Sequence, residues 1–247
     1  MAKISDVNAI QVFDSRGVPT ISCKITLDNG ISASSMVPSG ASTGSKESLE
    51  LRDNETSYHG KGVLKAVSNI KNKLKPLILG LNPANQLEID QILIDFDGTE
   101  DKSKIGANSI LAISLAISHA AAKDQNIDLH EHFQNLYKNI TGDSIKPSIP
   151  IPMFNILNGG EHANNNIDIQ EFMIIPKGAK NFSEIMKWSS EIYHNLKNIL
   201  QIKGFSSSVG DEGGFAPNLE SNEEAIKLII EAIKSSGLKP GVDVNIA

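Results

Sequence analysis

The sequence predicts an α+β domain, a three-stranded meander with helices, followed by the beginning of a TIM-like α/β barrel that stays incomplete. Three observations support this fold class. The opening residues alternate apolar and polar side chains, and amphipathic helices follow them. From Ile151 onward, short apolar runs bounded by glycine-rich turns are separated by long helices.

The opening strands are expected to form an antiparallel meander. Apolar residues alternate with polar ones along 21–27 and again along 31–37, and the tight-turn sequence Asp28-Asn29-Gly30 separates these runs. Apolar positions from Ile4 to Val12 supply the remaining strand.

Helices are expected next. Apolar residues at 63, 67, 70 and 74 share one face of the first, which should end at Pro76. The second should begin at Asn82-Pro83, a capping residue followed by proline at the first helical position. The third, from Ala107 to about Asp124, is alanine-rich and is expected to be largely buried.

Glycine, serine and proline between Thr141 and Pro152 predict a junction between a domain of residues 1–140 and a domain of residues 141–247. The second domain should contain a helix over 182–202. Another helix is expected to open at the capping box Ser221-Asn222-Glu223-Glu224 and to stop at Gly237. Apolar residues at 242, 244 and 246 then alternate as a strand would.

Composition indicates a soluble, cytoplasmic globular protein. The 247 residues are 40% hydrophobic, with no apolar run long enough to cross a bilayer and no signal-peptide core at the start. A net charge of -6 argues against nucleic acid as the main partner. The single Cys23 lies in a strand-like run, where a buried structural thiol is expected.

Two glycine-flanked segments, 155–172 and 209–218, carry the functional signal. Both set acid, amide and imidazole groups among glycines, where a ligand can approach the backbone closely. His162 lies beside a glycine pair and is open to a binding or acid–base role. Glu171 should stand at the mouth of a strand, with Gln170 pointing to the other face.

Glu171 and Glu212 come from separate strand ends. If the fold brings the two carboxyl groups together, the pKa of one of them rises and that group stays protonated as a general acid. The alternative is a pair of solvated acids in loops. The chain shows neither the spacing of a calcium-binding EF-hand nor that of a zinc site.

The loop Pro38-Ser39-Gly40-Ala41-Ser42-Thr43-Gly44 follows a predicted strand. Its glycines are too closely spaced for the phosphate-binding loop of nucleotide hydrolases. Two interpretations remain, a plain surface turn and a flexible loop that closes over a ligand.

Together these motifs resemble those of the enolase family, the phosphopyruvate hydratases. The resemblance spans the whole chain and depends on the ordered set rather than on any one motif. Ahead of the two glycine-flanked segments the set comprises Asp14-Ser15-Arg16-Gly17, the loop from Pro38 to Gly44, Glu50-Leu51-Arg52-Asp53, Gly60-Lys61-Gly62-Val63, Asp97-Gly98-Thr99-Glu100 and Gly106-Ala107-Asn108.

The resemblance implies a glycolytic lyase that reversibly dehydrates 2-phosphoglycerate to phosphoenolpyruvate with two Mg²⁺ ions. In that family the metal ions stabilise an enolate, a lysine removes a proton, and a glutamic acid protonates the departing hydroxide. Glu212 matches this general acid and Glu171 its carboxyl partner. Gln170 and His162 match substrate contacts, and Ser42 matches the mobile-loop ligand of the second Mg²⁺.

The family's metal-binding carboxylates and base lysine match no position in the sequence. The stretch from Pro150 to Ala247 is also well short of the roughly 250 residues that a complete barrel needs. We therefore expect the 247-residue chain alone to be inactive. The alternative function is that of a truncated, inactive fragment acting at most as a binding or surface protein. The resemblance also implies a homodimer or higher homo-oligomer.

Overall fold

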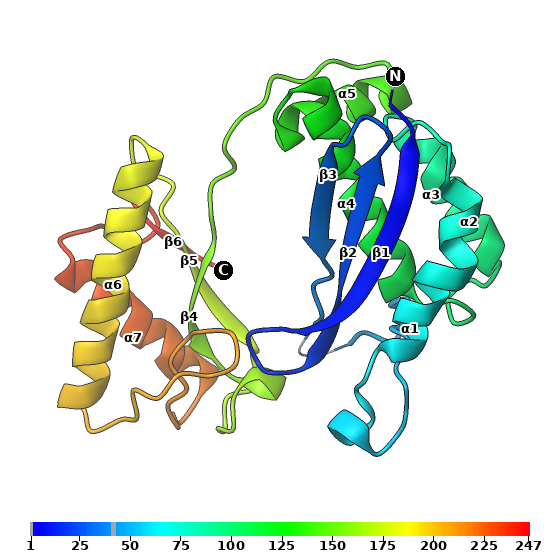
Figure 1. Cartoon of the computed structure of the whole chain (residues 1–247). Helices are drawn as coiled ribbons and strands as arrows, with labels where there is room; N and C mark the ends of the chain where they lie inside the picture. The colour runs from blue at the N-terminus through cyan, green and yellow to red at the C-terminus, as the bar shows by residue number, and fades with distance from the viewer. Residues whose placement is uncertain (1, 41–42) are drawn as a thin grey trace. The chain divides into compact units, whose positions relative to one another are not determined.

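A computed structural model describes residues 2–40 and 43–247, so Ser42 lies outside the described residues. The chain forms two compact units, Met1–Pro147 and Ser148–Ala247. The units are coloured from blue to green and from green to red in Figure 1. The boundary placed after residue 140 is a prediction from composition, and the compact units divide somewhat further along the chain.

The first unit contains the predicted meander. Strands β1 (Ile4–Phe13), β2 (Pro19–Leu27) and β3 (Ser32–Met36) pair antiparallel in that order. In this register Ile25 lies opposite Val7 on one side and Ala33 on the other, and all three are buried. The alternation in the sequence therefore predicted the core-facing side of the sheet correctly.

Cys23 belongs to the same buried face and is 0% exposed. Burial raises the pKa of its thiol to about 12, because the thiolate would have to form in an apolar environment. The prediction of a buried structural thiol is confirmed.

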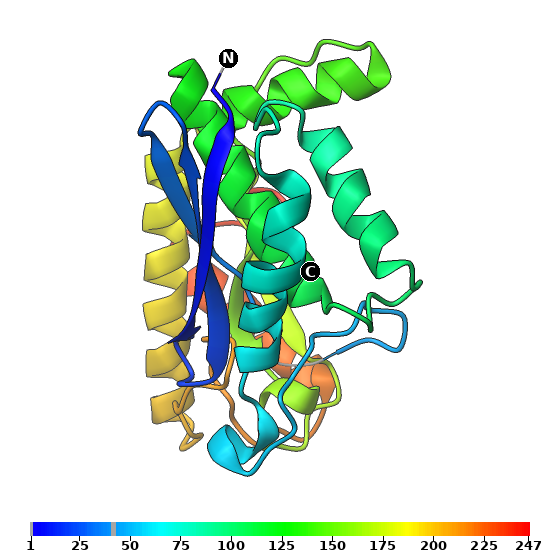
Figure 2. The ribbon, with the colours of Figure 1, turned by 45° about the vertical axis from the view of Figure 1, so that its right-hand side comes forward.

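Helices cover the buried side of the sheet. The alanine-rich helix α4 (Ala107–Gln125) packs against β2 and β3, and Figure 2 shows it running along the sheet. Its alanines allow close approach to the strands. The helical segments of this unit are η1 (Ser57–Gly60), α1 (Leu64–Asn69), η2 (Ile70–Leu74), α2 (Lys75–Ile78), α3 (Gln86–Asp97), α4 (Ala107–Gln125) and α5 (Leu129–Thr141).

Two predicted helix boundaries were wrong, the end of the first helix and the start of the second. The first helix passes through Pro76 because η2 is a π-helical turn, in which the Lys75 amide donates to the carbonyl of Ile70. This wider turn accommodates the proline that a regular α-helix would not tolerate. The next helix starts at Gln86 rather than at Pro83, because Asn82 accepts from the Ala84 amide at 3.0 Å and forms a turn instead.

The buried His132 of α5 is only 2% exposed, and its Nε2 has no hydrogen-bond partner among the described residues. Burial lowers the pKa of this imidazole below its usual 6.5, because the charged form loses its hydration. The unfolded chain therefore binds this proton more tightly than the folded chain does. Stability from this group is fully present above about pH 6.5 and is lost as the pH falls toward the lower pKa of the folded state.

Lowering the pH from about 7.5 to about 5.5 is thus expected to weaken the first unit, in the range where histidines titrate. Urea unfolding of the wild type and of His132→Gln at both pH values measures the effect. The variant should show the smaller pH dependence, while His130→Gln, at an exposed position, should behave like the wild type. Equal pH dependence in His132→Gln and the wild type would contradict this account.

The second unit contains a small antiparallel sheet in the order β4 (Phe154–Asn158), β5 (Glu171–Ile175) and β6 (Asn245–Ile246). The helices α6 (Phe182–Ile202) and α7 (Asn222–Ser235) pack against each other on one side of this sheet (Figure 1). A short η3 turn, Gly160–His162, follows β4. This is the predicted start of a barrel, in which Leu157 and Phe172 belong to one buried apolar cluster with residues of the two helices.

The helix limits of this unit agree with the predicted ones, with a change at the cap. Ser221 Oγ accepts from the Glu224 amide at 3.2 Å, but the Glu224 carboxylate accepts from Glu220 instead of Ser221. The last strand is shorter than predicted. Residues before Asn245 form a turn, closed by a 2.7 Å bond from the Gly241 amide to the Val244 carbonyl.

None of the helices in the described part of the chain has the length and apolar character needed to cross a membrane.

Candidate active site

The site is built where β4 ends and β5 begins. Asn158, the last residue of β4, lies opposite Glu171, the first residue of β5. Between them the chain turns sharply, and the Gly159 amide donates to the Gln170 carbonyl at 3.0 Å. A Cβ at Gly159 would lie 2.6 Å from the carbonyl oxygens of Ile167 and Ile169. Only glycine allows this close return of the loop.

The structure brings His162 and Glu171 together. Nδ1 of His162 lies 3.1 Å from Oε1 of Glu171, within ion-pair range but without hydrogen-bond geometry. The His162 side chain is 7% exposed and that of Glu171 is 36% exposed. The imidazole is therefore enclosed, while the carboxylate beside it reaches solvent. Such a pair leaves the solvent-facing side of the carboxylate open to a polar ligand.

Two open hollows lie beside the loop that follows β4. The larger, of about 660 Å³, is lined by His162, Asp211 and the serines at 206 and 208, among others. The smaller, of about 440 Å³, includes Gln170 and Asp168. Gln170 and His162 thus line different hollows.

Glu212 stands at the tip of a glycine turn and is exposed. Gly210 donates its amide to the Gly214 carbonyl at 2.8 Å, and the Asp211 amide donates to the His162 carbonyl at 3.1 Å. Among the described residues the Glu212 carboxylate has no hydrogen bond or ion pair. Its pairing with Glu171 stays a prediction, since the contact that Glu171 makes is with His162.

Helix α6 supports the same turn from the other side. The Tyr193 hydroxyl donates to the Gly213 carbonyl at 3.1 Å, and the Tyr193 ring stacks on Phe215 with centroids 4.4 Å apart. Burial raises the pKa of Tyr193, so the phenol stays protonated as a donor. The turn that presents Glu212 is consequently held on two sides.

Asparagine amides join the loops of the site, a role that sequence reasoning missed. Nδ2 of Asn165 donates to the carbonyls of Asn158, at 2.9 Å, and Pro217, at 3.0 Å. Asn166 pairs with both backbone groups of Leu219, at 2.5 and 3.0 Å. The run of three asparagines after His162 was the available signal, because amides can satisfy backbone donors and acceptors together.

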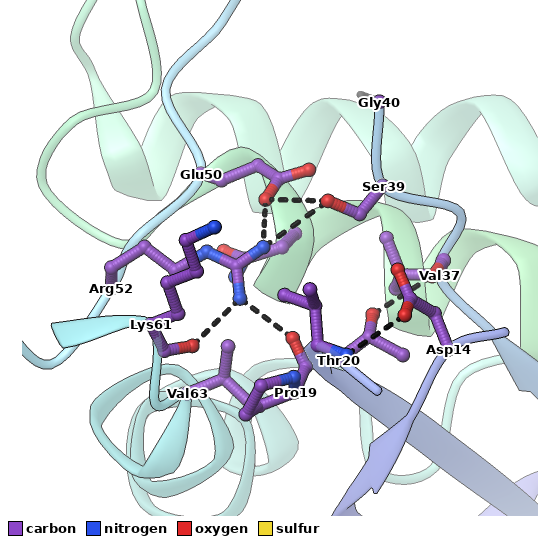
Figure 3. A network of polar contacts seen from close by, with 12 residues as sticks. Asp14, Pro19, Thr20, Val37, Ser39, Gly40, Glu50, Arg52, Lys61 and Val63 are labelled. Atoms are coloured by element: carbon purple, nitrogen blue, oxygen red, sulfur yellow. Dashed lines mark hydrogen bonds and ion pairs between the residues drawn. The ribbon is translucent and has the colours of Figure 1, made fainter. Parts of the chain in front are cut away.

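In the first unit, Arg52 fixes the start of the Pro38–Gly44 loop. Its guanidinium donates to the carbonyls of Pro19 and Lys61, at 2.6 and 2.8 Å (Figure 3). The other side of the same group contacts Ser39 Oγ at 3.1 Å and Glu50 Oε2 at 2.5 Å. The Glu50–Arg52 motif was noted in the sequence only as part of the resemblance. The planar fork of arginine explains why this residue type is needed.

Arg16 adds a second attachment. It donates to the carbonyl oxygens of Ser39 at 3.0 Å and of Gly40 at 3.3 Å. The chain is thus held immediately before Ala41 and Ser42, the two residues of this loop that lie outside the described ranges.

The described residues do not form a metal-binding cluster. Across 2–40 and 43–247, no group of three His, Cys, Asp or Glu side chains lies close enough to hold a metal ion. Ser42, the expected metal ligand, is outside these ranges.

An α+β domain joined to a partial TIM-barrel domain, with acid, amide and imidazole groups at the strand ends, defines a two-domain protein of the TIM-barrel class. The family model of the enolase N-terminal domain matches residues 4–133, and that of the enolase C-terminal TIM barrel domain matches residues 146–247. The chain belongs to the enolase family, which is a family of lyases.

Proposed function

We propose that the full-length gene product dehydrates 2-phosphoglycerate reversibly to phosphoenolpyruvate, as a glycolytic hydro-lyase. The observation that carries this proposal is the 3.1 Å contact between His162 and Glu171. Two residues assigned to the site by their motifs, separated by the asparagine-rich segment 163–170, meet at the start of β5 in a chain of the enolase family.

In the proposed reaction Glu212 is the general acid. Its position at the exposed tip of a turn leaves the carboxyl group accessible to a substrate. A carboxylic acid there can donate its proton to the departing hydroxide, which leaves as water. The turn is attached to the backbone of His162, so the acid and the enclosed imidazole belong to one supported structure.

Glu171 and His162 are proposed to contact the leaving-hydroxyl side of the substrate. The enclosed His162 lies 3.1 Å from one oxygen of the Glu171 carboxylate, and the solvent-facing side remains available for a hydroxyl group. Gln170, in the neighbouring hollow, is proposed as a further substrate contact.

Members of the enolase family use Mg²⁺, and two ions, one of them bound by Ser42, are proposed for this protein as well. A homodimer or higher homo-oligomer and a cytoplasmic location are likewise proposed by family resemblance and composition.

The purified full-length gene product, supplied with 2-phosphoglycerate and Mg²⁺, tests the activity. Phosphoenolpyruvate should form, as followed by its ultraviolet absorbance, and removal of the metal with a chelator should stop the reaction. Absence of phosphoenolpyruvate with Mg²⁺ present would refute the proposed function. The 247-residue chain, assayed in parallel, should be inactive, and turnover by it would overturn that expectation.

A further inference from the structure

We propose that Asn158 is a positioning residue for the general acid, and this inference rests on the proposed function. Asn158 ends β4 and is 0% exposed. It makes no contact with solvent, so it acts only through the groups that it binds. Those groups belong to the two segments that carry Glu171 and Glu212.

The carboxamide of Asn158 joins these segments directly. Its Nδ2 donates to the Gln170 carbonyl at 3.2 Å, in the peptide unit that leads into Glu171. Its Oδ1 accepts from the Gly214 amide at 2.8 Å, two residues beyond Glu212. One planar amide therefore connects the start of β5 to the turn of the general acid.

The turn fits closely around this amide. A Cβ on Gly214 would lie 2.6 Å from Asn158 Oδ1, and one on Gly210 would lie 3.3 Å from it. The two glycines at the ends of the turn therefore leave room for the Asn158 side chain between them. Because the Gly210–Gly214 bond closes the turn, Oδ1 of Asn158 fixes the base from which Glu212 projects.

The two bonds of Asn158 differ in how replaceable they are. The Gln170 carbonyl also accepts from the Gly159 amide at 3.0 Å, so it keeps a partner when the Asn158 side chain is removed. The Gly214 amide has no other acceptor among the bonds of the described chain. Loss of Oδ1 is thus expected to loosen the turn at Gly214 while leaving the strand pairing near Glu171 in place.

Asn158→Ala in the full-length gene product tests this role. Displacement of the acid by about 1 Å is expected to lower kcat about 100-fold, with little change in KM for 2-phosphoglycerate. Asn181→Ala is the matched control. Asn181 is also an asparagine whose side chain accepts a backbone amide, that of Glu184 at 2.9 Å, but it caps α6 away from the turn. The Asn181→Ala substitution should lower the thermal stability and leave kcat unchanged.

The double variant Asn158→Ala/Glu212→Gln separates positioning from general weakening. If Asn158 acts through Glu212, the double variant should be no slower than Glu212→Gln alone. Multiplicative losses, or an unchanged kcat in Asn158→Ala, would overturn the inference.

If Asn158→Ala does not fold, the same cycle is run with Asn158→Asp, which keeps an acceptor for the Gly214 amide. Asn158→Asp should lose less kcat than Glu212→Gln does. The double variant Asn158→Asp/Glu212→Gln should again be no slower than Glu212→Gln alone. Multiplicative losses in this second cycle would overturn the inference in the same way. An inactive wild type would instead refute the proposed function.

Discussion

Replacing Glu212 with glutamine in the full-length gene product is expected to lower turnover of 2-phosphoglycerate by about 10² to 10⁴-fold. Glutamine keeps the size of the side chain and its exposed place on the turn but cannot donate a proton to the departing hydroxide. Substrate binding should be nearly unchanged, because the exposed carboxylate supports no other described contact. Steady-state kinetics and substrate titration measure the two effects separately.

Glu220→Gln provides the control for Glu212→Gln. Glu220 is another exposed acid, shortly after the turn, and the contact described for it uses its backbone amide. Its replacement should leave turnover unchanged. Normal turnover in Glu212→Gln would remove Glu212 from the acid role, whereas loss of substrate binding would assign it to recognition instead.

Gly214→Ala is expected to destabilise the second unit by about 1–3 kcal/mol, as overpacking of a closely packed site does. The added Cβ would lie 2.7 Å from the Leu157 backbone nitrogen and 2.9 Å from the Ile156 carbonyl carbon. Backbone atoms of β4 cannot move aside as the end of a flexible side chain can. Turnover should fall together with stability, because the same turn carries Glu212.

Urea unfolding of Gly214→Ala, compared with Gly204→Ala, measures this steric effect. Gly204 has a φ of 78°, and an added Cβ there would meet nothing within 4 Å, so its substitution reports only left-handed backbone strain. Gly214 is not among the glycines with positive φ, so the loss of stability in Gly214→Ala should come from steric contact alone. If Gly214→Ala unfolds at the same urea concentration as the wild type, the close approach of the turn to β4 is wrong.

Much of the fold was predictable because it depends on local patterns. Alternation around Ile25 indicated the strands and their buried face, and apolar spacing indicated the limits of α6 and α7. The wrong helix boundaries arose where the backbone departs from regular helix geometry. Pro76 normally ends a helix, but a π-helical turn before it changes the hydrogen-bond spacing, and no residue type marks such a turn.

The site was predictable in its members and less so in its contacts. Glycine, acid and imidazole groups at strand ends identified His162 and Glu171, which the structure brings within 3.1 Å. The expected partner of Glu171 was another carboxyl group, Glu212, and no local pattern favoured His162 in its place. The bonds of Asn158 reach 12 and 56 residues along the chain, so they depend on the tertiary path rather than on any local period.

The burial of Cys23 has a practical consequence. It is the single cysteine of the sequence and lies in the sheet of the first unit, while the second unit has none. The Cys23 thiol, buried on the central strand with a pKa of about 12, reacts with an alkylating reagent only after the first unit opens. The rate of alkylation therefore reports opening of the first unit alone, without any engineered label.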